Sequence, residues 1–276
     1  MKLEGRVAVV MGAGQTPGET VGNGRATALL FAREGARVLC VDRDLPAAAD
    51  TAAEIEQEGG VGVPARADVT NEEDVAGAMA EAVAQFGRID ILHNNVGISI
   101  AGGDASVTEI EATAFDRLVA VNLRGMVFSC KYALPIMRAQ GSGAIVNVSS
   151  MAAWSMYPYV GYKTTKAAVI ALTEQVAIQN ARYGIRANVI LPGLMNTPMA
   201  VENRVRQRVG ADATPDELAA ARAAVVAERD AQVPLGARMG TAWDVARAAL
   251  FLASDDAGFI TGISLPVDGG ASVKVG

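Results

Sequence analysis

Apolar and polar positions along the chain form two kinds of segment that alternate. Short runs rich in Val, Ile and Leu are nearly continuous in apolar character. A strand that helices cover on both faces needs such an uninterrupted run, whereas a half-exposed strand would alternate. The runs predict seven strands, at Arg6–Gly12, Ala36–Asp42, Val61–Asp68, Ile89–Asn94, Gly143–Ser150, Ile185–Gly193 and Ile263–Gly270.

Longer Ala-rich stretches with periodic charge lie between these runs and predict helices. Strand and helix in strict alternation indicate a doubly wound α/β fold, in which a parallel sheet has helices on both faces. The expected helices are Arg25–Glu34, Leu45–Glu58, Glu72–Phe86, Thr113–Ala139, Tyr159–Tyr183 and Ala242–Ala253.

One segment breaks the alternation. Met199–Ala237 is rich in Arg, Glu and Ala and reads as one or two amphipathic helices without a strand. Gly210, Pro215 and Pro234 divide it. Because no repeat, low-complexity tail or interdomain linker is visible, we expect residues 1–276 to form a single domain. The segment at about 199–237 is expected to close over the substrate as a helical lid.

The charge of the chain limits its partners. The 276 residues carry 24 Lys and Arg against 30 Asp and Glu, a formal net charge of −6. Proteins that bind nucleic acid or anionic membrane surfaces carry a surplus of Lys and Arg. This chain has a surplus of acidic residues, so we expect neither partner. Small anionic ligands stay possible, because a few backbone amides can hold them.

The scarcity of His and Cys narrows the chemistry. One histidine and two cysteines cannot form the usual four-ligand zinc sites, so we expect no metal. His93 lies inside an apolar strand and is interpreted as a buried, hydrogen-bonded residue rather than a member of a Ser-His-Asp triad. Cys40 and Cys130 lie far apart and favour free thiols in a reducing cytoplasm. The chain begins with an apolar run too short for a signal peptide or a membrane span.

Glycines follow the first predicted strand. The strand ends at Gly12 and Gly14, and the next helix opens at Gly22, Asn23 and Gly24. Glycines let the backbone approach a pyrophosphate closely, and the amides of a helix start favour its negative charge. The intervening segment, 15–21, is longer than a compact G-x-G-x-x-G turn allows. Taken alone, the motif could also be a glycine-rich surface loop.

The ends of the next strands carry polar residues. Asp42 can accept hydrogen bonds from both hydroxyls of an adenosine ribose and would repel a 2′-phosphate, which favours NAD over NADP. Arg43 leaves the alternative open, because a guanidinium there could bind that phosphate or stack on adenine. The third and fourth strands are followed by further polar or small residues at the same sheet edge, namely Asp68, Val69, Asn95, Val96 and Gly97.

At this point the chain resembles the short-chain dehydrogenase/reductase family. The resemblance runs in order over nearly the whole chain, which is more specific than any one motif. It includes the Gly-rich turn, Asp68-Val69, Asn94 to Gly97, Asn122, Ile145 to Ser150, Tyr162 to Lys166, Pro192-Gly193 and Val267 to Gly270. It implies a Rossmann fold and a homotetramer. The chain departs from the family at Met11, where Thr is usual, at Val96, where Ala is usual, and in the longer turn, which we expect to form a flap over the pyrophosphate or a surface contact.

Two tyrosine–lysine pairs have the spacing that puts both side chains on one helix face. They are Tyr159 with Lys163 and Tyr162 with Lys166, and spacing alone does not choose between them. The resemblance favours Tyr162 and Lys166, because Ser150 lies twelve positions before Tyr162. A phenol with a pKa near 10 needs roughly 4 kcal/mol of preference for phenolate to act as a base at pH 7. A nearby ammonium and the positive ring of NAD⁺ can supply it.

The resemblance also implies roles for the other residues. Tyr162 would be the general acid and base, Lys166 would lower its pKa and hold the nicotinamide ribose, and Ser150 would orient the substrate oxygen, with neighbouring Ser149 as the alternative. Asn122 would anchor a water chain to the lysine; otherwise it is a helix residue that points to solvent. The carboxamide of nicotinamide is expected against Pro192, Gly193 and Thr197.

We therefore expect an NAD-dependent enzyme that interconverts a secondary alcohol and a ketone by hydride transfer. An NADPH-dependent carbonyl reductase of the same family and a non-catalytic dinucleotide-binding protein are the alternatives. The pocket walls are expected at Ser99–Thr108, Trp154–Tyr159 and the lid. The predicted wall residues are apolar and aromatic beside Ser150, and Arg and Glu lie on the lid. This composition mildly favours an apolar or cyclic alcohol as the substrate.

Overall fold

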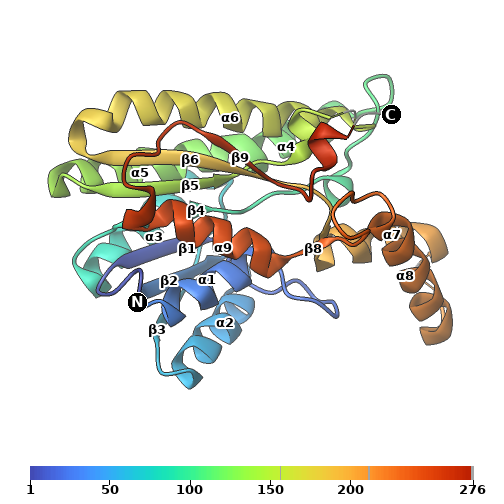
Figure 1. The fold of residues 1–276 in the computed structure, drawn as a ribbon, viewed down its shortest axis with the longest axis horizontal. Helices are drawn as coiled ribbons and strands as arrows, with labels where there is room; N and C mark the ends of the chain where they lie inside the picture. The colour runs from blue at the N-terminus through green and yellow to red at the C-terminus, as the bar shows by residue number, and fades with distance from the viewer. Residues whose placement is uncertain (156, 211, 275–276) are drawn as a thin grey trace.

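A seven-stranded parallel sheet forms the centre of the molecule (Figure 1). The computed structural model describes residues 1–155, 157–210 and 212–274. The strands are β1 (Val7–Met11), β2 (Arg37–Asp42), β3 (Val61–Arg66), β4 (Ile91–Asn94), β5 (Gly143–Val148), β6 (Ile185–Pro192) and β9 (Ser264–Val267). Their order across the sheet is β3-β2-β1-β4-β5-β6-β9. The doubly wound parallel sheet predicted from the apolar runs is confirmed, and each predicted strand overlaps an observed one.

Helices cover both faces of this sheet. One face packs against α1 (Asn23–Arg33), α2 (Leu45–Gln57) and α9 (Ala242–Ala253). The other packs against α3 (Glu72–Phe86), α5 (Gly125–Gln140) and α6 (Val160–Asn180). Alternate strand residues point to opposite faces, so every position of β1 is buried. This is why the strands read as continuous apolar runs.

The two cysteines are free and lie on opposite sides of the sheet. Cys40 belongs to the core beneath α1 and α9, and Cys130 to the core beneath α3 and α5. The prediction of free thiols is confirmed. Burial raises the pKa of each thiol to about 12, which keeps both thiols protonated near neutral pH.

The order of strands reverses at β1, because β2 and β3 lie on one side of it and β4, β5, β6 and β9 lie on the other. Strand β1 pairs with β2 on one side and with β4 on the other. The loops after β1 and β4 therefore diverge at the carboxyl end of the sheet and leave a crevice between them. Met11, at the end of β1, is in register with Val41 and Asn94, so the glycines after β1 lie beside the ends of both neighbours.

The helix predicted as one piece over Thr113–Ala139 contains a wider turn. It consists of α4 (Ala112–Val119), a π-helical turn at Ala120–Arg124, and α5. Such turns insert an extra residue and often occur at functional sites. Here the turn carries Asn122, whose side chain bonds the backbone of Ile98. Local sequence pattern could not predict it, because that bond spans 24 positions.

The segment that interrupts the alternation is a pair of helices, α7 (Pro198–Val209) and α8 (Pro215–Asp230). They project beyond the end of the sheet and bury a small apolar core of their own (Figure 1). Two short parallel strands, β7 (Met195–Asn196) and β8 (Gly240–Thr241), pair with each other just before α7 and after α8. The sequence did not predict them. Two-residue strands have no periodicity to detect. In the part of the chain that the structure describes, no helix is long and apolar enough to cross a membrane.

Candidate active site

A cavity of about 1080 Å³ opens at the carboxyl ends of the strands and extends beneath α7 and α8. Its walls include the ends of β1, β2, β5 and β6 and the loop after β4. All residues expected to hold the cofactor line it, and so does Ser150. They are Gly12, Gly14, Gly22, Asn23, Gly24, Asp42, Arg43, Asp68, Val69, Asn95, Val96, Gly97, Tyr162, Lys166, Pro192, Gly193 and Thr197. Asn122 does not line the cavity and lies behind its wall.

The glycine turn and the start of α1 are in close contact. A Cβ on Gly24 would collide with the carbonyl oxygen of Gly12, and Gly12 itself has a φ of +83°. The Asn95 amide donates to the same carbonyl at 3.1 Å and fixes the turn against the loop after β4. Oδ1 of Asn23 is buried without a hydrogen-bond partner among the described residues. No side chain caps the start of α1, so its first N–H groups are free to donate to a pyrophosphate.

Asp42 is fixed at the end of β2. Its carboxylate accepts hydrogen bonds from the backbone N–H of Gly14 at 3.0 Å and of Asp44 at 3.1 Å. Arg43 beside it is exposed. Burial alone would raise the pKa of the Asp68 carboxyl, but hydrogen bonds from Thr70 and the charges of Arg43 and Arg66 bring it below its ordinary value. The carboxylates of Asp42 and Asp68 thus lie at this end of the cavity.

The lengthened turn folds back on itself and contacts α7 and α8. The Gln15 amide donates to the carbonyls of Thr16 and Thr20 and accepts from Gly22 N–H at 3.2 Å. Glu19, further along, pairs with Arg222 of α8 at 2.7 Å. Of the two expectations for this insertion, a contact with another part of the surface is what the structure shows.

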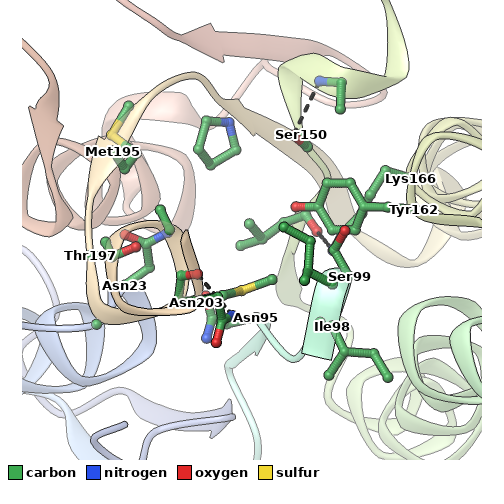
Figure 2. Close-up of a pocket in the computed structure, with 18 of the residues that line it drawn as sticks. Asn23, Asn95, Ile98, Ser99, Ser150, Tyr162, Lys166, Met195, Thr197 and Asn203 are labelled. Atoms are coloured by element: carbon green, nitrogen blue, oxygen red, sulfur yellow. Dashed lines mark hydrogen bonds between the residues drawn. The ribbon is translucent and has the colours of Figure 1, made fainter. Parts of the chain in front are cut away.

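Ser150, Tyr162 and Lys166 lie on one wall of the cavity, and Asn23 and Thr197 lie on the other (Figure 2). Ser150 follows β5, and the two other residues lie on the first turns of α6. Lys166 is buried. Its Nζ lies 5.7 Å from the centroid of the Tyr162 ring and donates to the Val148 carbonyl at 2.8 Å.

The protonation equilibria of this group are set mainly by burial. Burial raises the pKa of Tyr162 to about 12, while the Ser150 hydroxyl and the charge of Arg204 act in the opposite direction. Burial also lowers the pKa of Lys166 to about 8. The shift at Tyr162 is opposite to the one expected from the sequence, because burial outweighs the groups that lower the pKa, and Lys166, which donates to the Val148 carbonyl, is not among those groups. Additional positive charge is needed before the phenol can act as a base at neutral pH.

The two serines after β5 have different surroundings. Ser149 is buried, and its hydroxyl donates to the Lys166 carbonyl at 2.6 Å. Ser150 is only partly buried and interacts with the Tyr162 phenol, whose pKa it lowers. Ser150 is therefore the serine that a substrate oxygen next to Tyr162 could meet.

Asn122 is fully buried, so the interpretation as a solvent-facing helix residue is wrong. Its Oδ1 accepts from Ile98 N–H at 2.8 Å, and its Nδ2 donates to the Ile98 carbonyl and to Thr165. Thr165 precedes Lys166 on α6. Asn122 thereby joins the loop after β4 to the helix that carries Tyr162 and Lys166.

Sequence analysis missed Asp104. This buried carboxylate accepts from the backbone N–H of Gly161 at 2.8 Å and of Tyr162 at 2.9 Å. A side chain that caps the start of α6 would accept hydrogen bonds from these N–H groups. Tyr159 is at the cap position, but its side chain makes no such hydrogen bond. No local signal could have indicated this, because Asp104 precedes Gly161 by 57 positions.

The predicted pocket walls need correction. Of Ser99–Thr108, only Ser99 and Ile100 line the cavity. Trp154 is 52% exposed, and neither it nor Tyr159 lines the cavity, whereas Tyr157 does. Met156 lies outside the described residues. The ring of Tyr157 lies 5.5 Å from that of Tyr162, and its hydroxyl bonds Ser99.

His93 takes no part in the cavity. It is buried as expected, with its ring 6.1 Å from that of Phe31, and burial lowers its pKa to about 3. The expectation that it is hydrogen-bonded is wrong, because neither ring nitrogen has a partner among the described residues. A neutral imidazole inside the sheet core cannot serve a nucleophile at the sheet edge.

Known proteins resemble this chain along its whole length. A family model described as enoyl-(acyl carrier protein) reductase matches residues 19–272. The 2,5-dichloro-2,5-cyclohexadiene-1,4-diol dehydrogenase of Sphingobium indicum is 36% identical over 277 residues, which cover 99% of each chain. Levodione reductase of Leifsonia aquatica is 37% identical over 272 residues, 97% of this chain and 94% of its own.

Solved structures agree with these sequence matches. A crystal structure of levodione reductase has a TM-score of 0.86 and 33% identity, over 99% of this chain and all 100% of that one. The aldohexose dehydrogenase of Thermoplasma acidophilum has a TM-score of 0.82 and 30% identity, over 99% of this chain and 96% of that one. The chain therefore belongs to the short-chain dehydrogenase/reductase family of oxidoreductases, whose members bind nicotinamide dinucleotides.

Proposed function

We propose that the protein is an NAD-dependent oxidoreductase that interconverts a secondary alcohol and a ketone, with Tyr162 as the general acid and base. One observation carries the proposal: Ser150, Tyr162 and Lys166 share a cavity wall opposite the glycine turn. The reaction class follows from the family. Relatives named for diol oxidation and ketone reduction support it.

The three side chains have distinct tasks. The Tyr162 hydroxyl donates a proton to the carbonyl oxygen during reduction and accepts it during oxidation. Ser150 holds that oxygen by a hydrogen bond from its partly exposed hydroxyl. Lys166 supplies positive charge beside the Tyr162 ring, and Asn122 and Asp104 keep the segment around Tyr162 in position.

The cofactor site has an adenosine end and a nicotinamide end. When bound, the dinucleotide supplies the hydride donor or acceptor and, in its oxidised form, a positive ring. Asp42, Arg43, Asp68 and Val69 form the adenosine end. The turn from Gly12 to Gly24 would hold the pyrophosphate, and Pro192, Gly193 and Thr197 would hold the carboxamide.

The preference for NAD over NADP depends on Asp42 in this proposal. Its carboxylate, held by two backbone N–H groups, accepts hydrogen bonds from ribose hydroxyls and repels a 2′-phosphate. We expect kcat/KM for NAD⁺ to exceed that for NADP⁺ by at least about tenfold, the equivalent of 1.4 kcal/mol. Asp42→Ala should abolish this preference, because the repulsion is removed.

Asp44→Ala is the matched control for that experiment. Asp44 is an exposed carboxylate two positions away that caps α2. Its loss should leave the ratio of the two kcat/KM values unchanged. A wild-type preference for NADP⁺ would contradict the proposal and favour the NADPH-dependent carbonyl reductase, with Arg43 as the phosphate ligand.

A panel of secondary alcohols with NAD⁺, and of ketones with NADH, tests whether the protein is an enzyme. We expect turnover, followed by the absorbance of NADH, for at least one member of the panel. Calorimetry that shows NADH binding, together with no turnover in either direction, would instead indicate a non-catalytic dinucleotide-binding protein.

We also propose that residues 1–276 act as one Rossmann-type domain in which α7 and α8 form the lid over the substrate end. The family suggests a homotetramer, and exposed apolar residues such as Ile178 and Phe259 support subunit contacts. Light scattering should then give four times the 28.5 kDa chain mass. The two free thiols support a reducing compartment such as the cytoplasm.

A further inference from the structure

Two arginines of the lid line the cavity without a carboxylate partner. Arg229, on the last turn of α8, is only 8% exposed, and its one side-chain hydrogen bond to another described residue runs from Nε to Sδ of Met239 at 3.3 Å. Arg204, on α7, donates from Nη1 to the Ala200 carbonyl of its own helix. Within residues 1–155, 157–210 and 212–274, no carboxylate oxygen lies within 4.0 Å of either guanidinium.

The acidic side chains around the pair are engaged elsewhere. Glu228 pairs with Arg208 at 2.7 Å, and Glu202 pairs with Arg222 at 2.8 Å. Asp230 accepts from Met239 N–H at 2.7 Å and acts on Arg229 only through space. The pair therefore has uncompensated positive charge.

The pair lies at the substrate end of the cavity. The charge of Arg204 acts on the phenols of both Tyr157 and Tyr162, and Tyr157 in turn acts on Arg229. The Tyr157 and Tyr162 rings are 5.5 Å apart. Arg204, Arg229, Tyr157 and Tyr162 thus line one cavity, and Arg204 acts on the phenol that would exchange the proton.

A buried guanidinium without a counter-ion is costly. Burial, together with the charge of Arg204, lowers the pKa of Arg229 to about 10. The penalty for burying an ion in a protein amounts to several kcal/mol unless an opposite charge and hydrogen bonds offset it. A bound anion would offset it, and the planar fork of a guanidinium matches the oxygens of a carboxylate or sulfonate.

We propose that Arg204 and Arg229 bind an anionic group of the substrate, so that the physiological substrate is a hydroxy or oxo acid rather than a neutral alcohol. The inference rests on the proposed oxidoreductase function and specifies its substrate class. The acid group would bind at the arginine pair while the carbinol carbon lies at Tyr162, since both line the same cavity. The sequence mildly favoured an apolar or cyclic alcohol as the substrate. This proposal instead requires a substrate that carries an anionic group.

The test compares 3-oxocyclohexane-1-carboxylate with its methyl ester, which differ in charge at one group, under saturating NADH. Wild type should reduce the acid with a kcat/KM at least about tenfold higher than the ester, since hydrogen bonds to charged groups contribute about 1.5–3 kcal/mol. Arg204→Gln and Arg229→Gln should each lower kcat/KM for the acid by about 10- to 100-fold, mainly through KM. The ester should change little.

Arg206→Gln is the matched control, because Arg206 lies on the same helix as Arg204 but is exposed and does not line the cavity. It should leave the ratio of acid to ester unchanged. Equal wild-type kcat/KM for acid and ester would overturn the inference. So would arginine variants that raise KM for NADH instead, because the pair would then serve the cofactor phosphates.

A binding measurement keeps the inference testable even if no ketone is reduced. Cyclohexanecarboxylate and cyclohexanesulfonate have no reacting carbon, and each is added to the NADH-loaded protein. At least one should raise the Tm of wild type but not of Arg229→Met, whose own Tm should not fall because Met replaces an uncompensated charge. No stabilisation of wild type by either anion would contradict the inference, whereas absence of turnover alone would contradict only the proposed function.

Discussion

The two overlapping tyrosine–lysine pairs on α6 differ in their surroundings. Lys163 donates to the carbonyls of Ala152 and Ser155 and so fastens the loop after β5. Lys166 is buried beside the Tyr162 ring and faces Gly97, where a Cβ would come within 3.0 Å of its Nζ. Spacing left both pairs open, and the tertiary contacts assign a structural role to the first and a place in the cavity to the second.

Asp104 is predicted to position Tyr162. Asp104→Ala removes the acceptor for two N–H groups in the first turn of α6, which should cost about 1–2 kcal/mol of stability, as the loss of a cap does. It should also lower kcat, because Tyr162 is the third residue of that turn, while KM for NADH stays unchanged. Urea unfolding and steady-state kinetics measure both effects.

Asp104→Asn is the rescue variant for this prediction. It keeps one of the two acceptor oxygens and should recover part of the stability and of kcat. A wild-type kcat in Asp104→Ala would show that α6 holds Tyr162 in place without this carboxylate.

At the scale of elements, the lengthened turn contacts α7 and α8, the helices of the proposed lid. The Arg222 guanidinium lies between Glu19 of the turn and Glu202 of α7, with 2.7 and 2.8 Å separations. Gly18 is also packed against Pro198, since a Cβ there would come within 2.9 Å of that ring. A dinucleotide that orders the turn would thereby also favour a closed lid.

Arg222→Ala tests this coupling. Loss of the bridge should increase amide hydrogen exchange in residues 15–21 and raise KM for both NADH and substrate by about two- to fivefold, the effect of about 0.4–1 kcal/mol. Arg208→Ala breaks an ion pair that lies within α7 and α8 only, and it should leave the exchange of the turn unchanged. Unchanged exchange of residues 15–21 in Arg222→Ala would rule out the coupling.

Some elements could be predicted from the sequence and others could not. The strands could, because burial on both faces leaves apolar runs, and the polar ends of β2 and β4 converge because parallel strands end at one edge. The π turn at Asn122 and the cap from Asp104 could not, because each depends on a partner distant in sequence. Arg229 read as part of an amphipathic helix, and only the packing of α8 shows that it faces a cavity.

At the scale of the whole molecule, burial of Lys166 links stability to pH. Burial lowers its pKa from 10.5 to about 8, so between these values the unfolded chain binds more protons at this residue than the folded one does. The contribution of Lys166 to the free energy of unfolding therefore rises with pH across this window, by about 3 kcal/mol at most.

Lys166→Met isolates that contribution. Cys40, Cys130 and Tyr162 have raised pKa values and act in the opposite direction at high pH, so only the difference between wild type and variant is informative. Urea unfolding should show wild type gaining stability relative to Lys166→Met from pH 8 to pH 10.5. A difference that stays constant would mean that Lys166 keeps its charge in the folded protein.

The most direct measurement compares Tyr162→Phe with Tyr159→Phe on the best substrate of the alcohol panel. Each variant loses one hydroxyl, but only Tyr162 lines the cavity beside Ser150 and Lys166. Tyr162→Phe should bind NADH with an unchanged Kd and lose about 10²- to 10⁴-fold in kcat, the usual contribution of a general acid and base. Tyr159→Phe should keep the wild-type kcat. An unchanged kcat in Tyr162→Phe would contradict the assignment of Tyr162 as the proton donor and acceptor.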